Sequence, residues 1–193
     1  NVSIGAHPSF KDPENFGNTM KLKLMVIHHC LKKSKYVLFT DGDIFYYRPG
    51  FIEYLIENLG DRNILAQNDK CEGQFSKSDG KPVCCAGFMF IKQNEETLKI
   101  YDMLTNDPYY SEKIKNTKRW GNFDDQLYLR KIRNERNNIV KMDLLPSFLF
   151  PTYFVKRYKQ NIKNIEEKFL MHFNYLIGKE KITTMIGCGC WIK

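Results

Sequence analysis

The stretch from Lys35 to Asp43, KYVLFTDGD, decides how the rest of this sequence is interpreted. Its centre, residues 36–40, is a continuous run of apolar, aromatic and β-branched residues, which predicts a short strand buried on both faces, as in a parallel sheet. The run stops at Asp41 and Asp43, and two carboxylates this close repel each other unless water or a cation lies between them. We expect Gly42 to let the backbone turn tightly enough for both carboxylates to reach one point.

The pair Asp41 and Asp43 is therefore a candidate metal site. Carboxylate oxygens suit Mg²⁺ and Mn²⁺, and an ion held by one or two carboxylates keeps positions open for substrate phosphates. A solvated Asp-Gly-Asp turn is the alternative, because turns favour the same residue types.

Composition sets the class of protein. The 193 residues, of which 42% are hydrophobic, predict one folded domain over 1–193. No apolar run approaches the roughly 18–20 residues that a membrane-spanning helix needs. Lysine and arginine outnumber aspartate and glutamate by 30 to 22, which favours a polyanionic or phosphorylated partner. Nucleic acid is not the expected partner, since the basic residues are scattered in small clusters rather than gathered in one stripe.

The six cysteines do not form a disulfide or zinc framework. Cys84 and Cys85 are adjacent, and Cys188 and Cys190 are one residue apart, which suits neither ordinary bridging within a pair nor the CxxC spacing of structural zinc sites. Reduced, mostly buried thiols are expected, which indicates a cytosolic compartment.

The first half of the chain predicts an α/β arrangement. Residues 1–19, rich in glycine and proline, are expected to form a surface loop, in which His7 has no partner. A helix is expected over 19–33, followed by the strand at 36–40, a second helix from Pro49 to Gly60 and a strand at 64–67. The predicted apolar face of the first helix is Leu22, Met25, Val26 and Cys30, and that of the second is Phe51, Tyr54, Leu55 and Leu59.

The second half continues the alternation. A loop is expected over 68–82, and a strand over 84–91 whose glycine indicates a bulge or a close approach by another group. Further helices are expected over 95–105 and from Asn122 onward, and strands over 139–142 and 168–173. An extended segment is expected over 144–151, and the last twenty residues are expected to be irregular.

Four motifs then occur in a recognisable order. They are Val37–Asp43, Ala86–Ile91, Asp125-Gln126, and His172-Phe173-Asn174 with Gly178 and the lysines beyond it. Together, from about Phe16 to Trp191, the chain resembles a GT-A glycosyltransferase of the nucleotide-diphospho-sugar transferase family, and is similar to members found in large DNA viruses. The resemblance implies a Rossmann-type, mixed and mainly parallel sheet flanked by helices. Because only forty residues precede Asp41, the family's usual first strand and base-gripping helices either lie upstream or are replaced.

The resemblance also implies residue roles. Asp41 and Asp43 match the DxD motif that holds a divalent ion, Mn²⁺ or Mg²⁺, against the donor diphosphate, and His172 matches a late histidine that completes the ion's ligands. Lys179 and Lys181 match the basic residues that neutralise the departing diphosphate.

Four further positions match the family's sugar-binding motifs. Asp125 and Gln126 match the acidic–amide pair that faces the sugar in retaining members. Ala86 and Gly87 match small residues that let the donor approach. Cys85 stands where the family often has asparagine.

The function implied is transfer of a sugar, hexose or pentose, from a nucleotide-diphosphate donor to an acceptor hydroxyl, with retention of configuration. A UDP-sugar is the expected donor, and a glycan, a protein or a small molecule the expected acceptor. The cytoplasm is the expected compartment, of a host cell if the protein is viral, or the Golgi lumen if an upstream anchor was removed. Two alternatives stay open: a haloacid-dehalogenase-like phosphatase, although Phe45 does not fit its motif, and a basic module that binds nucleic acid or acidic glycan.

Overall fold

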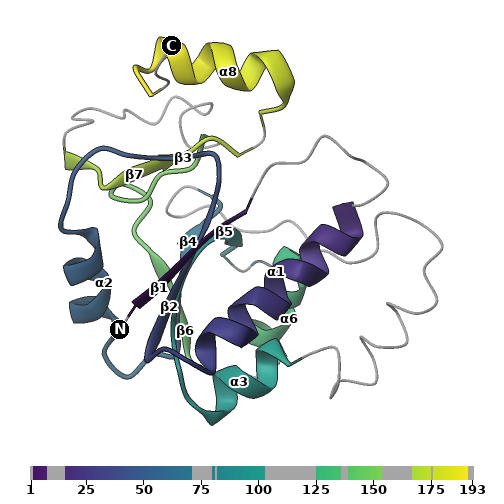
Figure 1. The fold of residues 1–193 in the computed structure, drawn as a ribbon. Helices are drawn as coiled ribbons and strands as arrows, with labels where there is room; N and C mark the ends of the chain where they lie inside the picture. The colour runs from purple at the N-terminus through teal and green to yellow at the C-terminus, as the bar shows by residue number, and fades with distance from the viewer. Residues whose placement is uncertain are drawn as a thin grey trace.

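A computed structural model describes residues 2–7, 16–70, 80, 82–102, 125–135, 139–153, 167–174 and 176–190. Within these residues, two sheets are built, a larger one with strand order β1-β2-β5-β4-β6 and a smaller one that pairs β3 with β7 (Figure 1). The larger sheet contains β1 (Val2–His7), β2 (Tyr36–Asp41), β4 (Ile64–Asn68), β5 (Cys84–Lys92) and β6 (Met142–Leu145). The smaller sheet contains β3 (Ile44–Tyr46) and β7 (Leu170–His172).

The larger sheet is mixed but mainly parallel. β2 is parallel to β1, β4 is parallel to β6, and β5 runs antiparallel to both of its neighbours, β2 and β4. The strands β1, β2, β4 and β6 therefore share one direction, and their carboxyl ends lie at one edge of the sheet. This confirms the α/β fold class that the sequence predicts.

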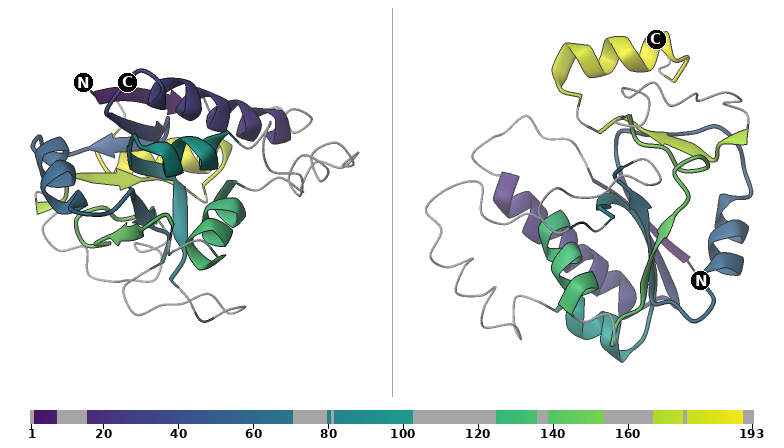
Figure 2. Two further views of the ribbon diagram at one scale, coloured as in Figure 1. Left: turned by 90° about the horizontal axis from the view of Figure 1, so that it is seen from below. Right: turned by 180° about the vertical axis from the view of Figure 1, so that it is seen from behind.

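Helices cover both faces of the larger sheet (Figures 1 and 2). Helices α1 (Phe16–Leu31), α3 (Glu95–Tyr101) and α6 (Asp125–Glu135) pack on one face, and α2 (Phe51–Leu59) packs on the other. The strand β2 contributes to both cores: Val37 and Phe39 pack toward α1, while Leu38 packs toward α2. Among the described residues, no helix has the length and the apolar composition that crossing a membrane requires.

The N-terminal segment differs from the surface loop expected over 1–19. Residues 2–7 form β1, which pairs with β2 along its whole length, and α1 already begins at Phe16. The register sets His7 beside Asp41, so this histidine lies at the edge of the sheet where the acids lie. Among the described residues one strand, β1, and one helix, α1, precede β2, and the expectation of missing N-terminal elements stays a prediction.

The buried face of α1 also differs from the prediction. Leu22, Met25 and Val26 are about half exposed, whereas the buried residues are Lys23, Leu24, Ile27 and Leu31. Both sets have helical spacing, so this apolar-rich helix offers two possible faces. The sheet covers the face that carries Leu24, Ile27 and Leu31, and Lys23 lies on that face beside acidic partners described below.

The strand β5 carries the irregularity that its glycine predicts. Opposite β4, the pairing jumps from Ala66–Met89 to Gln67–Cys85, so the residues between Cys85 and Met89 bulge out of the ladder. The helix α2 likewise confirms its prediction, with Leu55 and Leu59 buried and the chain turning at Gly60 with a positive φ of 54°.

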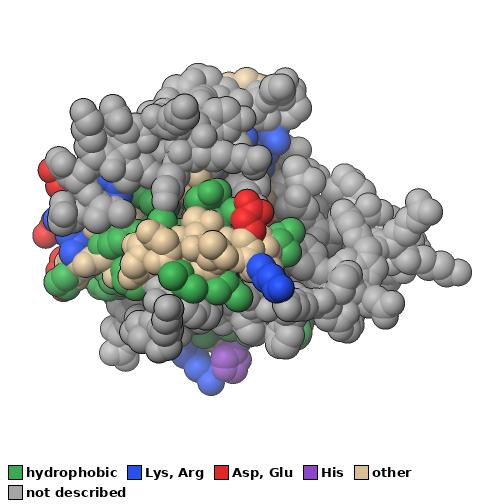
Figure 3. All heavy atoms as spheres, turned by 90° about the horizontal axis from the view of Figure 1, so that it is seen from above, with side chains coloured by type: hydrophobic (Ala, Val, Ile, Leu, Met, Phe, Trp, Pro, Cys, Tyr) green, Lys and Arg blue, Asp and Glu red, His purple; other side chains and the backbone are tan. Residues whose placement is uncertain are grey.

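Two elements near the C-terminus differ from what the sequence predicts. β6 begins at Met142, where the predicted strand 139–142 was to end, and Ile139 is exposed. The final residues, expected to be irregular, include α8 (Gly178–Gly187), which starts at a glycine with a positive φ and buries Met185 against the smaller sheet. Ile182 and Ile186 remain exposed on α8. In the view from above, hydrophobic side chains flank this helix (Figure 3).

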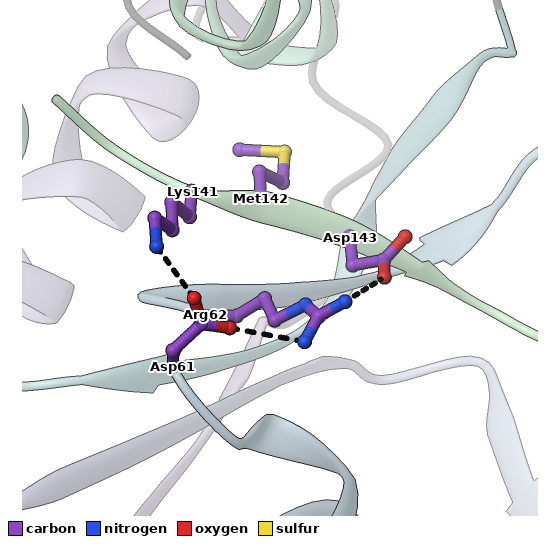
Figure 4. A pocket seen from close by; sticks show the side chains of 5 residues that line it. All are labelled: Asp61, Arg62, Lys141, Met142 and Asp143. Atoms are coloured by element: carbon purple, nitrogen blue, oxygen red, sulfur yellow. Dashed lines mark hydrogen bonds and ion pairs between the residues drawn. The ribbon is translucent and has the colours of Figure 1, made fainter. Parts of the chain in front are cut away.

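The amino ends of β4 and β6 lie at the opposite edge of the sheet from Asp41. There the surface is hollowed between Asp61, Arg62, Lys141, Met142 and Asp143 (Figure 4). The charged groups pair with one another: Lys141 Nζ lies 2.5 Å from Asp61 Oδ2, and the Arg62 guanidinium lies 3.0 Å from Asp61 and 3.5 Å from Asp143. Because these side chains are largely exposed, their ion pairs contribute little to stability.

Candidate active site

Asp41 and Asp43 bring their carboxylates to the same side of the chain at the carboxyl end of β2. The chain turns at Gly42 and Asp43, as expected, although Gly42 is not among the glycines with positive φ. The turn brings both carboxylates to His172, so that a ligand atom of each acid lies within 4.8 Å of the other. Their side chains are 28% and 13% exposed, so both remain reachable from solvent.

His172 joins the two acids from the smaller sheet. β3 pairs with β7 so that Ile44 lies opposite His172, and the Phe173 backbone N–H donates to the Asp43 carbonyl oxygen at 3.0 Å. This pairing sets His172 Nε2 3.1 Å from Asp43 Oδ1 and 3.7 Å from Asp41 Oδ2. One ligand atom from each of the three residues lies within 4.8 Å of the others, a spacing at which the three could hold a metal ion.

Gly87 makes room for this cluster. It lies in the bulge of β5, and a Cβ at this position would overlap the His172 ring and an Asp41 carboxylate oxygen. The close approach expected at this glycine is thus made by the metal-site side chains themselves. Ala86, its neighbour, is buried in the core between the sheet and the helices.

Lys181 reaches the same cluster from α8. Its Nζ lies 2.5 Å from Asp43 Oδ2. Burial alone would raise the pKa of the Asp43 carboxyl, but hydrogen bonds and charge attraction from His172 and Lys181 hold that pKa well below its usual range. Lys179 is exposed on the same helix, so of the two predicted lysines the structure brings Lys181 to the acids.

Asp125 forms a buried ion pair that the sequence did not predict. Its Oδ2 lies 2.7 Å from Lys23 Nζ, which is also 3.6 Å from Asp41 Oδ1 and 4.4 Å from the centre of the Phe39 ring. Burial favours the neutral amine of Lys23, but the charges of Asp125 and Asp41 raise its pKa, so the lysine is a cation. Lys23 thereby links the predicted sugar-facing acid to the predicted metal-binding acid.

Gln126 belongs to a second cluster, at the end of β4. Its Nε2 donates to Asp69 Oδ2 at 3.1 Å, and Asn174 Nδ2 donates to Asp69 Oδ1 at 3.0 Å. Asp69 is 2% exposed. Asn174 lies two residues beyond His172, so the Gln126 cluster and the metal-site cluster adjoin.

Sequence reasoning missed Lys23, Gln67 and Asp69. Asp69 follows a buried strand, as Asp41 does, and the same rule would have found it. Predicting Lys23 would have required knowing which face of α1 is buried. Gln67 accepts from His172 Nδ1 at 2.9 Å inside the core, and nothing in the sequence distinguishes it from other polar residues in strands.

Two solved glycosyltransferases share this fold, which is the GT-A fold. A glycosyltransferase involved in the glycosylation of the major capsid of PBCV-1 has a TM-score of 0.57 at 10% identity, with 93% of this chain and 80% of that chain covered. The galactosyltransferase LgtC, in complex with donor and acceptor sugar analogues, has a TM-score of 0.52 at 16% identity, with 84% and 64% covered.

The sequence places the chain within a family of this fold. Residues 6–185 match the nucleotide-diphospho-sugar transferase family, and the chain belongs to it. A relative, the UDP-galactose:fucoside alpha-3-galactosyltransferase of Dictyostelium discoideum, is 28% identical over an alignment of 185 residues that covers 88% of this chain. The chain spans only 27% of that relative's length.

Proposed function

We propose that this chain is a metal-dependent glycosyltransferase that moves a sugar from a nucleotide-diphosphate donor to an acceptor hydroxyl. The observation that carries the proposal is the convergence of Asp41, Asp43 and His172 at the carboxyl end of β2, in a chain of the transferase family. Open α/β sheets bind their ligands outside this end of the strands.

The donor atoms fit a divalent ion. Two carboxylates suit Mn²⁺ and Mg²⁺ alike, and the imidazole of His172 favours Mn²⁺ of the two. When bound, such an ion supplies Lewis-acid stabilisation of the negative charge on the leaving diphosphate.

Residues around the metal site would bind the rest of the donor. Lys181, and Lys179 on the same helix, would offer positive charge to the diphosphate. Asp125 and Gln126 would face the sugar, with Lys23 holding the Asp125 carboxylate in place. The relative from Dictyostelium takes UDP-galactose by name, which supports a UDP-sugar donor. We propose retention of configuration, and a glycan, a protein or a small molecule as acceptor.

Thermal unfolding in the presence of sugar nucleotides tests the proposal. A UDP-sugar should raise the melting temperature only when Mn²⁺ is present, since a ligand at about 100 times its Kd stabilises the folded state by about 2.7 kcal/mol. An effect of nucleic acid that ignores Mn²⁺ and falls steeply with salt would favour the basic binding module instead. Release of phosphate from a simple phosphate ester, with no response to sugar nucleotides, would favour the phosphatase.

Replacing both acids locates the site. The double variant Asp41→Ala, Asp43→Ala should lose Mn²⁺-dependent donor turnover and the Mn²⁺-dependent thermal shift. Asp143→Ala, which removes an exposed acid at the opposite edge of the sheet, is the matched control and should keep both. Donor turnover that survives in the double variant rules out the assigned site.

A further inference from the structure

We infer that Gln67 is a positioning residue for the metal site: it fixes which ring nitrogen of His172 faces the cation. The inference rests on the proposed metal site and adds to it a residue that never touches the ion. Gln67 lies near the carboxyl end of β4, is 0% exposed, and belongs to none of the motifs that mark the acids or His172.

The backbone fixes the orientation of the Gln67 amide. Its Nε2 donates to the carbonyl oxygens of Phe150, at 3.0 Å, and Pro151, at 3.1 Å. An amide nitrogen carries two hydrogens, and both are used here. The other end of the amide, Oε1, is a pure acceptor and lies 2.9 Å from His172 Nδ1.

An acceptor at this position requires a proton on His172 Nδ1. With Nδ1 protonated, Nε2 is the nitrogen that offers its lone pair once a cation takes the place of the proton shared with Asp43 Oδ1; it also faces Asp41 Oδ2. Cys85 Sγ is also near Nδ1, at 3.6 Å, but burial raises the pKa of its thiol, and a neutral sulfur is only a weak acceptor.

The Pro151 carbonyl group positions both the His172 ring and the Gln67 amide. The Pro151 carbonyl oxygen accepts from Gln67 Nε2 and also from the His172 backbone N–H, at 3.0 Å. The ring and the amide that orients it are therefore tied to one point of the backbone. Metal-binding histidines are commonly oriented through their second nitrogen, and loss of that partner typically costs about 10–100-fold in metal affinity.

Two substitutions separate positioning from packing. Gln67→Met keeps the length and the buried volume but offers no acceptor to Nδ1. Gln67→Glu keeps the acceptor but loses both donors to the Phe150 and Pro151 carbonyls. We expect both variants to lower the melting temperature. Only Gln67→Met should weaken Mn²⁺ binding, by about 10–100-fold, when free Mn²⁺ is titrated by electron paramagnetic resonance without donor or acceptor.

The outcomes distinguish this inference from the proposed function. If the wild type binds no Mn²⁺, the metal site itself is refuted. If the wild type binds Mn²⁺ and Gln67→Met binds it equally well, only the role of Gln67 is refuted. Equal losses in Gln67→Met and Gln67→Glu would assign Gln67 to packing and also overturn the inference.

A spectroscopic measurement on the wild type needs neither variant to fold. In protein loaded with diamagnetic Cd²⁺, ¹⁵N spectra should show His172 protonated at Nδ1 and not at Nε2. The chain has only 4 histidines, and the signal lost in His172→Ala gives the assignment. A proton on Nε2 in the Cd²⁺-loaded protein would overturn the inference.

Discussion

Replacing Lys181 with methionine should affect the metal and the nucleotide in opposite directions. In the free protein, Lys181 Nζ lies 2.5 Å from Asp43 Oδ2, on the carboxylate whose other oxygen faces His172. The ammonium therefore already neutralises a group that the metal ion needs. Lys181→Met removes that competing cation, so it should strengthen Mn²⁺ binding in the absence of donor while weakening the binding of UDP to the Mn²⁺-loaded protein.

The structure sets the size of the effect. Both side chains are mostly buried, at 21% exposed for Lys181 and 13% for Asp43, so solvent screens the pair only in part. A hydrogen bond between charged groups contributes about 1.5–3 kcal/mol net. Each 1.4 kcal/mol is about tenfold in affinity, so Mn²⁺ should bind about 10–100 times more tightly to Lys181→Met.

Titration of Mn²⁺ by electron paramagnetic resonance, followed by calorimetry with UDP, measures both halves of the prediction. Lys33→Met is the control for charge alone, since Lys33 is an exposed lysine just beyond α1 and its loss changes the net charge equally. We expect this control to match the wild type. A Lys181→Met protein that binds Mn²⁺ no better than the wild type would refute the competition between the ammonium and the ion.

Three further substitutions test the surroundings of the site. Gly87→Ala should weaken Mn²⁺ binding at least about tenfold, because the added methyl group overlaps the His172 ring. The control is Gly187→Ala, which should bind Mn²⁺ like the wild type because nothing lies within 4 Å of the added carbon. Lys23→Met should lower the free energy of unfolding in urea by about 3–5 kcal/mol, because it leaves a buried carboxylate without its cation, and a loss below about 1 kcal/mol would contradict a buried pair. Asp43 has a lowered pKa in the folded state, so its stabilising contribution is complete above the carboxyl's ordinary pKa of 3.8 and is lost as the pH falls below it. The stability gap between the wild type and Asp43→Asn should therefore narrow from about pH 6 to about pH 3, and a constant gap would contradict the assignment.

Two residues of the proposed metal site, Asp41 and Asp43, could be predicted from a local motif. Asp41 and Asp43 follow a run that is apolar on both faces, and such a run is detectable without any knowledge of its neighbours. His172 and Lys181 required a resemblance, since a histidine or a lysine late in the chain has no distinctive spacing of its own. In the structure three of these four, Asp41, Asp43 and His172, lie close together, with Lys181 beside them.

The residues that support the site could not be predicted, because their roles depend on pairing between distant segments. Gln67 becomes a partner of His172 only when β4 lies beside the Phe150–Pro151 segment, more than eighty positions along the chain. Lys23 is distinguished from Lys21, the other lysine of α1, only once the sheet covers one face of the helix.

The formation of β1 could not be predicted for the same reason: it depends on pairing with a distant segment. Residues 2–7 form a strand because all six pair in parallel with β2, although the glycine and proline content of the first 19 residues is typical of a loop. That pairing extends the sheet to the edge where His7 lies beside Asp41. The buried strand that ends in Asp41 thus decides more than the metal site: it also orders a segment whose own sequence favours no regular structure.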